Sequence, residues 1–199
     1  MAEKKESGGM GITLIIILVV VGMAVWATIS PAYLMSTLKQ ERAFTLDLGG
    51  GAADQWIYTK TMATSIEQLK DVTTGIKQAT TLPSVMRDWV QNRILSTWLW
   101  GTLIMYRAYM MLLYFFILMP FTLAIFLDGW WVREISMHRF SSQSAARHRV
   151  GVVISTMTLF GVCIWIVIPF PIPSVVAPLA IISVGFASWM WLSNLQKRI

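Results

Sequence analysis

The stretch that decides the fold is MMLLYFFILMPFTLAIFLDGWWVREISMHRF, residues 110–140. Its first part, up to Leu127, contains no Lys, Arg, Asp or Glu, and its last part brings two acids, a glycine, two tryptophans and two arginines together. A helix needs about 20 apolar residues to cross the hydrocarbon core of a bilayer. Tryptophans and basic residues gather where such a helix leaves the membrane. The stretch therefore predicts a transmembrane helix and its exit.

The composition of the whole chain agrees with this interpretation. Of its 199 residues, 56% are apolar and only 13% are charged, whereas soluble proteins carry about 25% charged residues. The charge-free segments are 12–29, 108–127, 150–168 and 174–192. We therefore expect an all-α, polytopic membrane protein with four transmembrane helices and a helical external hairpin.

The charge-free segments divide the chain into nine parts. The first apolar segment could be a secretory signal, but it is longer than the usual core of about 7–15 residues and no A-x-A site follows, so we interpret it as an uncleaved anchor. The expected parts are a cytoplasmic N-terminus (1–11), transmembrane helix 1 (12–29), a periplasmic helical region (30–97), transmembrane helix 2 (98–127), a basic cytoplasmic loop (128–149), transmembrane helix 3 (150–168), a periplasmic turn (169–173), transmembrane helix 4 (174–193) and a cytoplasmic tail (194–199).

The basic residues set the expected orientation. The 128–149 loop holds four arginines against two acids, the N-terminus contributes Lys4 and Lys5, and the tail contributes Lys197 and Arg198. Basic residues in short loops mark the cytoplasmic side, whereas long translocated segments are largely exempt. Both termini and the 128–149 loop of this multi-pass protein are therefore expected in the cytoplasm, and the long external segment lies in the periplasm if the host is a Gram-negative bacterium. The net charge of +6 suits contact with the anionic lipid bilayer, and direct contact with DNA is not expected.

One charged residue, Arg107, lies inside the second apolar segment. Counted back from Asp128 it falls near the outer interface, where its side chain could snorkel to the headgroups. The alternative is an intramembrane arginine that pairs with a carboxylate of a partner protein. The lone cysteine, Cys163, lies in the middle of the third segment, where we expect a buried, unreactive thiol.

The external region is expected to be helical. Gly49–Gly51 is interpreted as a flexible hinge, because no phosphate-binding pattern follows it. Apolar residues then recur at helical spacing from Trp56 to a helix end near Ala79. Pro83 is favourable in a first turn, and the helix that starts near it runs on into the second transmembrane segment. So small a region is marginal as an independent core, so docking on a partner or self-association is plausible.

Motifs for catalysis, metals and cofactors are missing from the sequence. His138 and His148 lie in one loop without the cysteine or carboxylate spacing of a zinc site. No Walker, dinucleotide-binding or haem-attachment pattern occurs. We expect a protein that is not an enzyme and has no catalytic residues, metal or cofactor. The alternative function is a small oligomeric transporter or channel, for which the apolar segments offer only Thr, Ser and Arg107.

Membrane physics explains most of the exit stretch. Trp130 and Trp131 suit an interfacial aromatic belt, and Arg133 and Arg139 lie where positive charge is favoured. Asp128 is explained less well, since an acid at this position gains nothing from lipids. It could pair with Arg133 or reach a partner.

The run PFTLAIFLDGWWVREISMHRFSSQSAARHR, residues 120–149, resembles a pattern found in membrane proteins of integrating conjugative elements and conjugative plasmids. In that family an apolar span ends in Asp-Gly, an arginine follows, and a Ser-rich turn leads to a His/Arg pair. The matching positions here are Asp128, Gly129, Arg133, Ser141, Ser144, His148 and Arg149.

The resemblance implies a role in bacterial conjugation. Members of the family are encoded beside the coupling protein, a hexameric membrane ATPase that brings DNA to a type IV secretion channel. The resemblance implies a non-catalytic accessory protein that binds and braces this ATPase within the bilayer and through the 128–149 loop. The expected partner-binding residues are Asp128, Gly129, Trp130, Trp131, Arg133, Arg139, His148 and Arg149.

Overall fold

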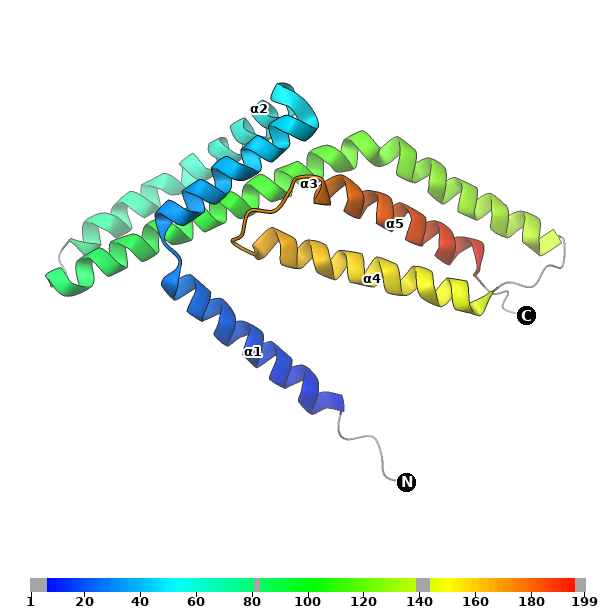
Figure 1. The fold of residues 1–199 in the computed structure, drawn as a ribbon, viewed down its shortest axis with the longest axis horizontal. Coiled ribbons are helices and arrows are strands. Elements are labelled where there is room, and N and C mark those ends of the chain that lie inside the picture. Colours follow the sequence, from blue (N-terminus) through cyan, green and yellow to red (C-terminus); the bar gives the residue numbers. More distant parts are fainter. Residues whose placement is uncertain (1–6, 81–82, 139–143, 196–199) are drawn as a thin grey trace. The chain divides into compact units, whose positions relative to one another are not determined.

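The computed structural model describes residues 7–80, 83–138 and 144–195 of the chain. The regular elements in these ranges are all helices, so the all-α expectation is confirmed (Figure 1). The helices are α1 (Ser7–Thr28), α2 (Pro31–Ala79), α3 (Ser84–His138), α4 (Ala145–Val167) and α5 (Val176–Ser193).

Three of the described helices, α3, α4 and α5, are long and apolar enough to cross a membrane. A fourth crossing is reached only if the end of α1 and the start of α2, which meet at a bend of 100°, are taken as one broken span. The number of four transmembrane helices therefore stays a prediction. The longest helix, α3, has 55 residues and measures about 80 Å at 1.5 Å per residue.

Helix α2 consists of two arms, residues 31–49 and 51–79, joined at Gly50. Gly50 has φ +74°, a left-handed conformation that glycine adopts without strain. A Cβ on the neighbouring Gly49 would lie 2.9 Å from the Tyr114 hydroxyl. The chain reverses here, as Figure 1 shows at the end of the first arm. The glycines expected to form a flexible hinge thus form a defined turn packed against α3.

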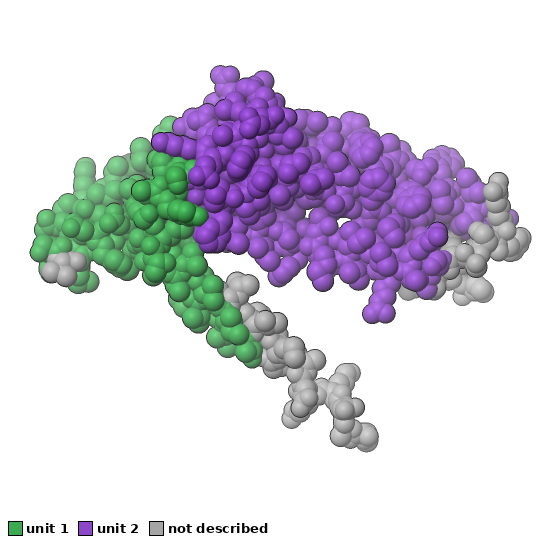
Figure 2. All heavy atoms as spheres, in the orientation of Figure 1, with its two compact units in different colours: residues 1–36, 64–102 green, residues 37–63, 103–199 purple. Residues whose placement is uncertain are grey.

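The chain divides into two compact units, which Figure 2 distinguishes by colour. In unit 1, residues 1–36 and 64–102, side chains of α3 bind the end of α1. The Arg93 guanidinium donates a hydrogen bond to the Trp26 carbonyl, and the Trp26 indole donates to the Thr97 hydroxyl at 2.9 Å. The Ser96 hydroxyl donates to the Ile29 carbonyl at 3.3 Å. Polar groups of one helix therefore satisfy the last carbonyls of another.

Unit 2 contains residues 37–63 and 103–199, and within it α4 and α5 form a close hairpin. A Cβ on Gly151 would lie 2.8 Å from the Ala187 carbonyl oxygen and 2.9 Å from the Trp191 nitrogen. Helix α3 approaches α5 in the same way, because a Cβ on Gly129 would lie 3.1 Å from the Trp189 Cα. Small residues let the helix backbones come together.

The single cysteine differs from its expected setting. Cys163 was expected to be buried, but its side chain is exposed on the surface of α4. The physical reason is that α4 buries little of itself, with Gly151 and Trp165 as its buried residues. A charge-free segment indicates an apolar environment, but it does not distinguish protein from surrounding lipid.

The α4–α5 contact yields a testable pair of substitutions. Gly151→Ala should lower the free energy of unfolding by about 1–3 kcal/mol, because the new methyl group meets backbone atoms that cannot move aside. Gly161→Ala, on the same helix, should be neutral or stabilising, because nothing lies within 4 Å of the added Cβ and alanine favours a helix. Thermal unfolding of the purified protein in detergent measures both, and equal effects would contradict the packing.

Candidate functional site

In unit 2, Arg107 of α3 makes polar contacts with several segments, and its side chain is fully buried. Its neighbours Leu103, Tyr106 and Met110 are also buried, at the spacing of three and four residues that marks the packed face of a helix. A charged group at such a position must find compensating partners, since burial of an unpaired ion is very costly. The expectation that Arg107 snorkels to the headgroups is wrong.

The partner of Arg107 is Glu41, from the first arm of α2. The arginine Nε donates to both carboxylate oxygens, at 3.1 and 3.0 Å, and Nη2 also donates to Oε1. Both side chains are fully buried. The alternative expectation, a carboxylate supplied by another protein, is therefore corrected, because the acid comes from this chain.

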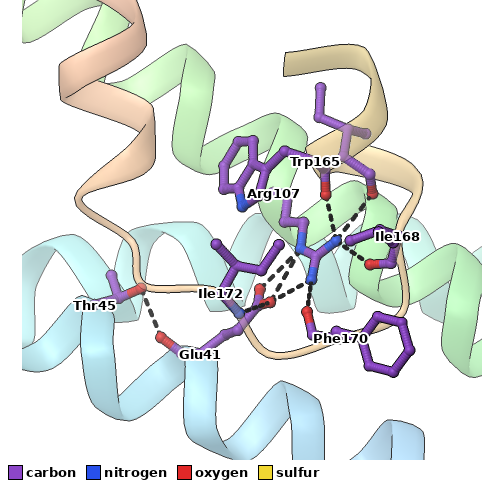
Figure 3. Close-up of polar contacts among 8 residues, drawn as sticks. Glu41, Thr45, Arg107, Trp165, Ile168, Phe170 and Ile172 are labelled. Carbon is purple, nitrogen blue, oxygen red and sulfur yellow. Dashed lines mark hydrogen bonds and ion pairs between the residues drawn. The ribbon is translucent and has the colours of Figure 1, made fainter. Parts of the chain in front are cut away.

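The remaining donors of Arg107 bind the end of α4 and the turn that follows it (Figure 3). Nη1 donates to the carbonyls of Trp165, Ile166 and Ile168, and Nη2 donates to the Phe170 carbonyl at 2.6 Å. The last carbonyls of a helix lack partners within the helix and carry its partial negative charge. The Arg107 guanidinium donates hydrogen bonds to these carbonyls, and its positive charge offsets the partial negative charge at the end of the helix.

The carboxylate of Glu41 also contacts the turn between α4 and α5. The Ile172 amide donates to Glu41 Oε1 at 3.3 Å, and the Ser174 hydroxyl donates to the Phe44 carbonyl at 2.8 Å. Arg107 and Glu41 thus join three segments that are distant in sequence: the first arm of α2, the middle of α3 and the α4–α5 turn. We call these two residues with their carbonyl and amide partners the Arg107 cluster.

A second polar cluster binds the two arms of α2 to α3. The Tyr106 hydroxyl donates to Thr45 at 2.9 Å and to Asp54 at 3.2 Å. Arg42 donates to both oxygens of Asp54, at 3.1 and 2.6 Å. These hydrogen bonds with Asp54 are the main reason that the pKa of Arg42 is raised above its ordinary value. The turn at Gly50 is thereby fixed from both sides.

Two of the predicted partner-binding residues, Asp128 and Gly129, contact Trp189 of α5. The Asp128 carboxylate accepts a hydrogen bond from the Trp189 indole at 2.8 Å. Gly129 is buried against the same residue of α5. The contact with Trp189 gives Asp128 a partner within the chain, and its binding to another protein stays a prediction. Asp128 and Gly129 join the end of α3 to α5.

The other predicted residues lie at the same end of unit 2 with different exposure. Trp131 is 63% exposed. The Arg133 guanidinium lies over the Trp130 ring, 5.7 Å from the ring centroid. His148 places Nδ1 3.3 Å from the Trp191 carbonyl oxygen. Arg149 is exposed. Arg139 and Ser141 lie outside the described residues.

Sequence reasoning missed Glu41, the residue that completes the Arg107 cluster. Glu41 stands in a segment with many charges, which was interpreted only as external chain. The signal was present in the spacing of Leu38, Glu41 and Thr45, which follows a packed helical face. An acid at such a position predicts a buried basic partner, and Arg107 was the one charge within the apolar segments.

The described helices define the class of this protein: an all-α chain with three apolar helices of membrane-crossing length, joined by buried polar clusters. The chain belongs to the DtrJ-like family, IncC plasmid conjugative DNA transfer proteins, whose pattern matches residues 43–196. This membership confirms the resemblance to proteins of conjugative plasmids and indicates a role in conjugation. No curated protein and no solved structure matches the chain. The matched region includes Arg107 and its carbonyl acceptors and begins two residues after Glu41.

The Arg107 cluster predicts an order of mutational effects. Arg107→Met should cost about 3–5 kcal/mol of unfolding free energy, because it leaves a buried carboxylate unpaired and removes the donors of several carbonyls. Glu41→Gln should cost less, because the arginine keeps its carbonyl acceptors. Arg42→Gln removes the guanidinium of a side chain that is itself 35% exposed and leaves the Tyr106 hydroxyl donating to Asp54, so it should cost less than Arg107→Met. Denaturant unfolding in detergent gives the order, and a Glu41→Gln effect larger than that of Arg107→Met would contradict it.

Proposed function

We propose that this chain is a non-catalytic accessory protein of the bacterial inner membrane that binds and braces the conjugative coupling ATPase. That ATPase delivers DNA to a type IV secretion system. Membership of a conjugative DNA transfer family supports a role in conjugation. The observation that carries the bracing role is the Arg107 cluster, which joins the helices of unit 2 through contacts within the chain.

The proposed topology has four transmembrane helices with both termini in the cytoplasm. Helices α3, α4 and α5 have the required length and composition, and α1 supplies the fourth crossing. The arms of α2 and the start of α3 then form the external hairpin, and the basic segment 128–149 faces the cytoplasm.

The exposed apolar surface of α4 supports an environment of lipid or partner helices. Met157, Leu159 and Phe160 are each at least 60% exposed. Soluble proteins rarely expose a large continuous apolar surface to water. Such a surface can pack against the transmembrane helices of another protein or against acyl chains. The internal contacts of unit 2 hold this surface in one orientation.

A docking surface for the cytoplasmic part of the ATPase is proposed at the end of α3. Trp131 and Ile135 are 63% and 49% exposed, and their spacing of four residues places them on one face of the helix. Arg149 adds an exposed positive charge near the start of α4. Exposed aromatic and arginine side chains are favoured at protein interfaces. Asp128 and Gly129 would position this surface through their contacts with α5.

The structure offers less support for the alternative, an oligomeric transporter or channel. Arg107, the charge that such a pore would use, donates from all three of its nitrogens to acceptors within the chain. It contributes no free donor to a transported ion, so the accessory role is the better supported proposal.

The topology predicts which side of the membrane reaches each exposed position. In a Cys163→Ala background, a membrane-impermeant maleimide should label Thr59→Cys in intact spheroplasts and should label Ala146→Cys only after lysis. Both positions are exposed in the structure, so accessibility depends on sidedness alone. Labelling of Ala146→Cys before lysis would invert the proposed orientation.

The docking surface predicts a specific loss of partner binding. Affinity purification of the tagged protein from cells carrying the conjugative element should recover the coupling ATPase, as measured by quantitative mass spectrometry. Trp131→Ala should reduce recovery roughly tenfold or more, because truncation of a central interface aromatic costs about 2 kcal/mol.

The matched control is Trp89→Ala, another exposed tryptophan, which lies near the start of α3 in the proposed external hairpin. It should retain most of the recovered ATPase. Equal losses from both variants would remove the case for docking at Trp131, and absence of the ATPase with wild-type protein would overturn the proposed function.

A further inference from the structure

Unit 2 contains an apolar groove of about 590 Å³ along α3, α4 and α5. Its α3 wall includes Phe115 and Phe126, its α4 wall includes Leu159 and Val162, and α5 contributes the small residue Gly185. The volume lies within the range of about 300–1,000 Å³ that is usual for sites that enclose small molecules. The Arg107 cluster does not use this groove.

Helical geometry continues the groove toward the end of α3 and the start of α4. Arg133 follows Phe126 by seven residues, about two turns of α-helix, so the two residues lie on nearly the same face of α3. On α4, His148 precedes Leu159 and Val162 by 11 and 14 residues, about three and four turns. The two walls therefore lead to Arg133 and His148.

Within residues 7–80, 83–138 and 144–195, no carboxylate forms an ion pair with Arg133. Its Nε atom is buried and has no hydrogen-bond partner in the described part of the chain. The two nearby acids are occupied elsewhere, since Asp128 binds the Trp189 indole and Glu134 lies 3.6 Å from His138. The ring of Trp130 contacts the guanidinium but brings no negative charge. A buried arginine nitrogen without an acceptor in the described chain can accommodate an anionic partner.

We infer that the groove binds an anionic phospholipid, with the phosphate at Arg133 and His148 and an acyl chain between the α3 and α4 walls. The charge of the proposed ligand complements the unpaired arginine, and its long apolar chain complements the walls. Basic pockets between transmembrane helices on the cytoplasmic side are suited to such headgroups. The inference rests on the membrane placement proposed above and is independent of the coupling ATPase.

The test is a titration of delipidated full-length protein in detergent with phosphatidylglycerol or phosphatidylcholine of identical acyl chains. Native mass spectrometry measures bound lipid, and thermal unfolding gives a second readout. Wild type should bind phosphatidylglycerol roughly fivefold more tightly, as about 1 kcal/mol for one arginine near a lipid headgroup implies. Arg133→Gln should lose this preference.

Two further variants and one competitor complete the test. Arg149→Gln removes an exposed arginine and should keep the preference, whereas Val184→Trp fills the groove and should weaken both lipids. Glycerol phosphate, which has no acyl chain, should not displace the lipid at equal concentration. No preference in wild type, equal losses from Arg133→Gln and Arg149→Gln, or unchanged binding by Val184→Trp would each overturn the inference.

A groove that instead takes a partner's transmembrane helix predicts no lipid preference in the purified protein. Because the titration contains no conjugation protein, its failure leaves the coupling-ATPase proposal standing. Loss of ATPase recovery likewise leaves the lipid result unaffected.

Discussion

The constraint on which the rest of unit 2 depends is the ion pair between Arg107 and Glu41. A buried arginine is tolerated only when its charge and its donors are satisfied together. Glu41 supplies the charge, and the carbonyls at the end of α4 accept the remaining donors. The first arm of α2 and the α4–α5 turn must therefore both be present at α3. Neither segment can move away alone without leaving an unpaired buried group.

The same physical solution occurs a second time along α3. Arg93 donates to the Trp26 carbonyl near the end of α1, and Arg107 donates to carbonyls at the end of α4. Each contact lies within one compact unit. In both, an apolar helix ends with carbonyl groups that have no partner within the helix, and an arginine of α3 supplies the donor. Helix α3 acts as the common element to which shorter helices are attached.

Much of the helical plan could be predicted from sequence, because it follows from local rules. The long helix starting near Pro83 and the short α4–α5 turn follow from apolar run length, proline placement and loop length. The turn at Gly50 was mistaken for a flexible hinge, since a run of glycines does not show what packs against it. Glu41 was missed because a carboxylate among other charges looks solvated unless its place on a packed helical face is counted. The Asp128 contact depends on Trp189, 61 residues away, and no local pattern specifies such a pair.

The position of the Arg107 cluster on α3 gives the proposed bracing role a structural basis. Trp131 lies 24 residues further along the same helix, a distance of about 36 Å at 1.5 Å per residue. Between them, α5 contacts α3 at Gly129 and Asp128. A helix fixed at both places cannot tilt at one end without disturbing the other. Because the polar groups of the cluster are satisfied within the chain, the proposed partner recognition rests on exposed side chains. Those side chains can change without disturbing the contacts that hold them in place.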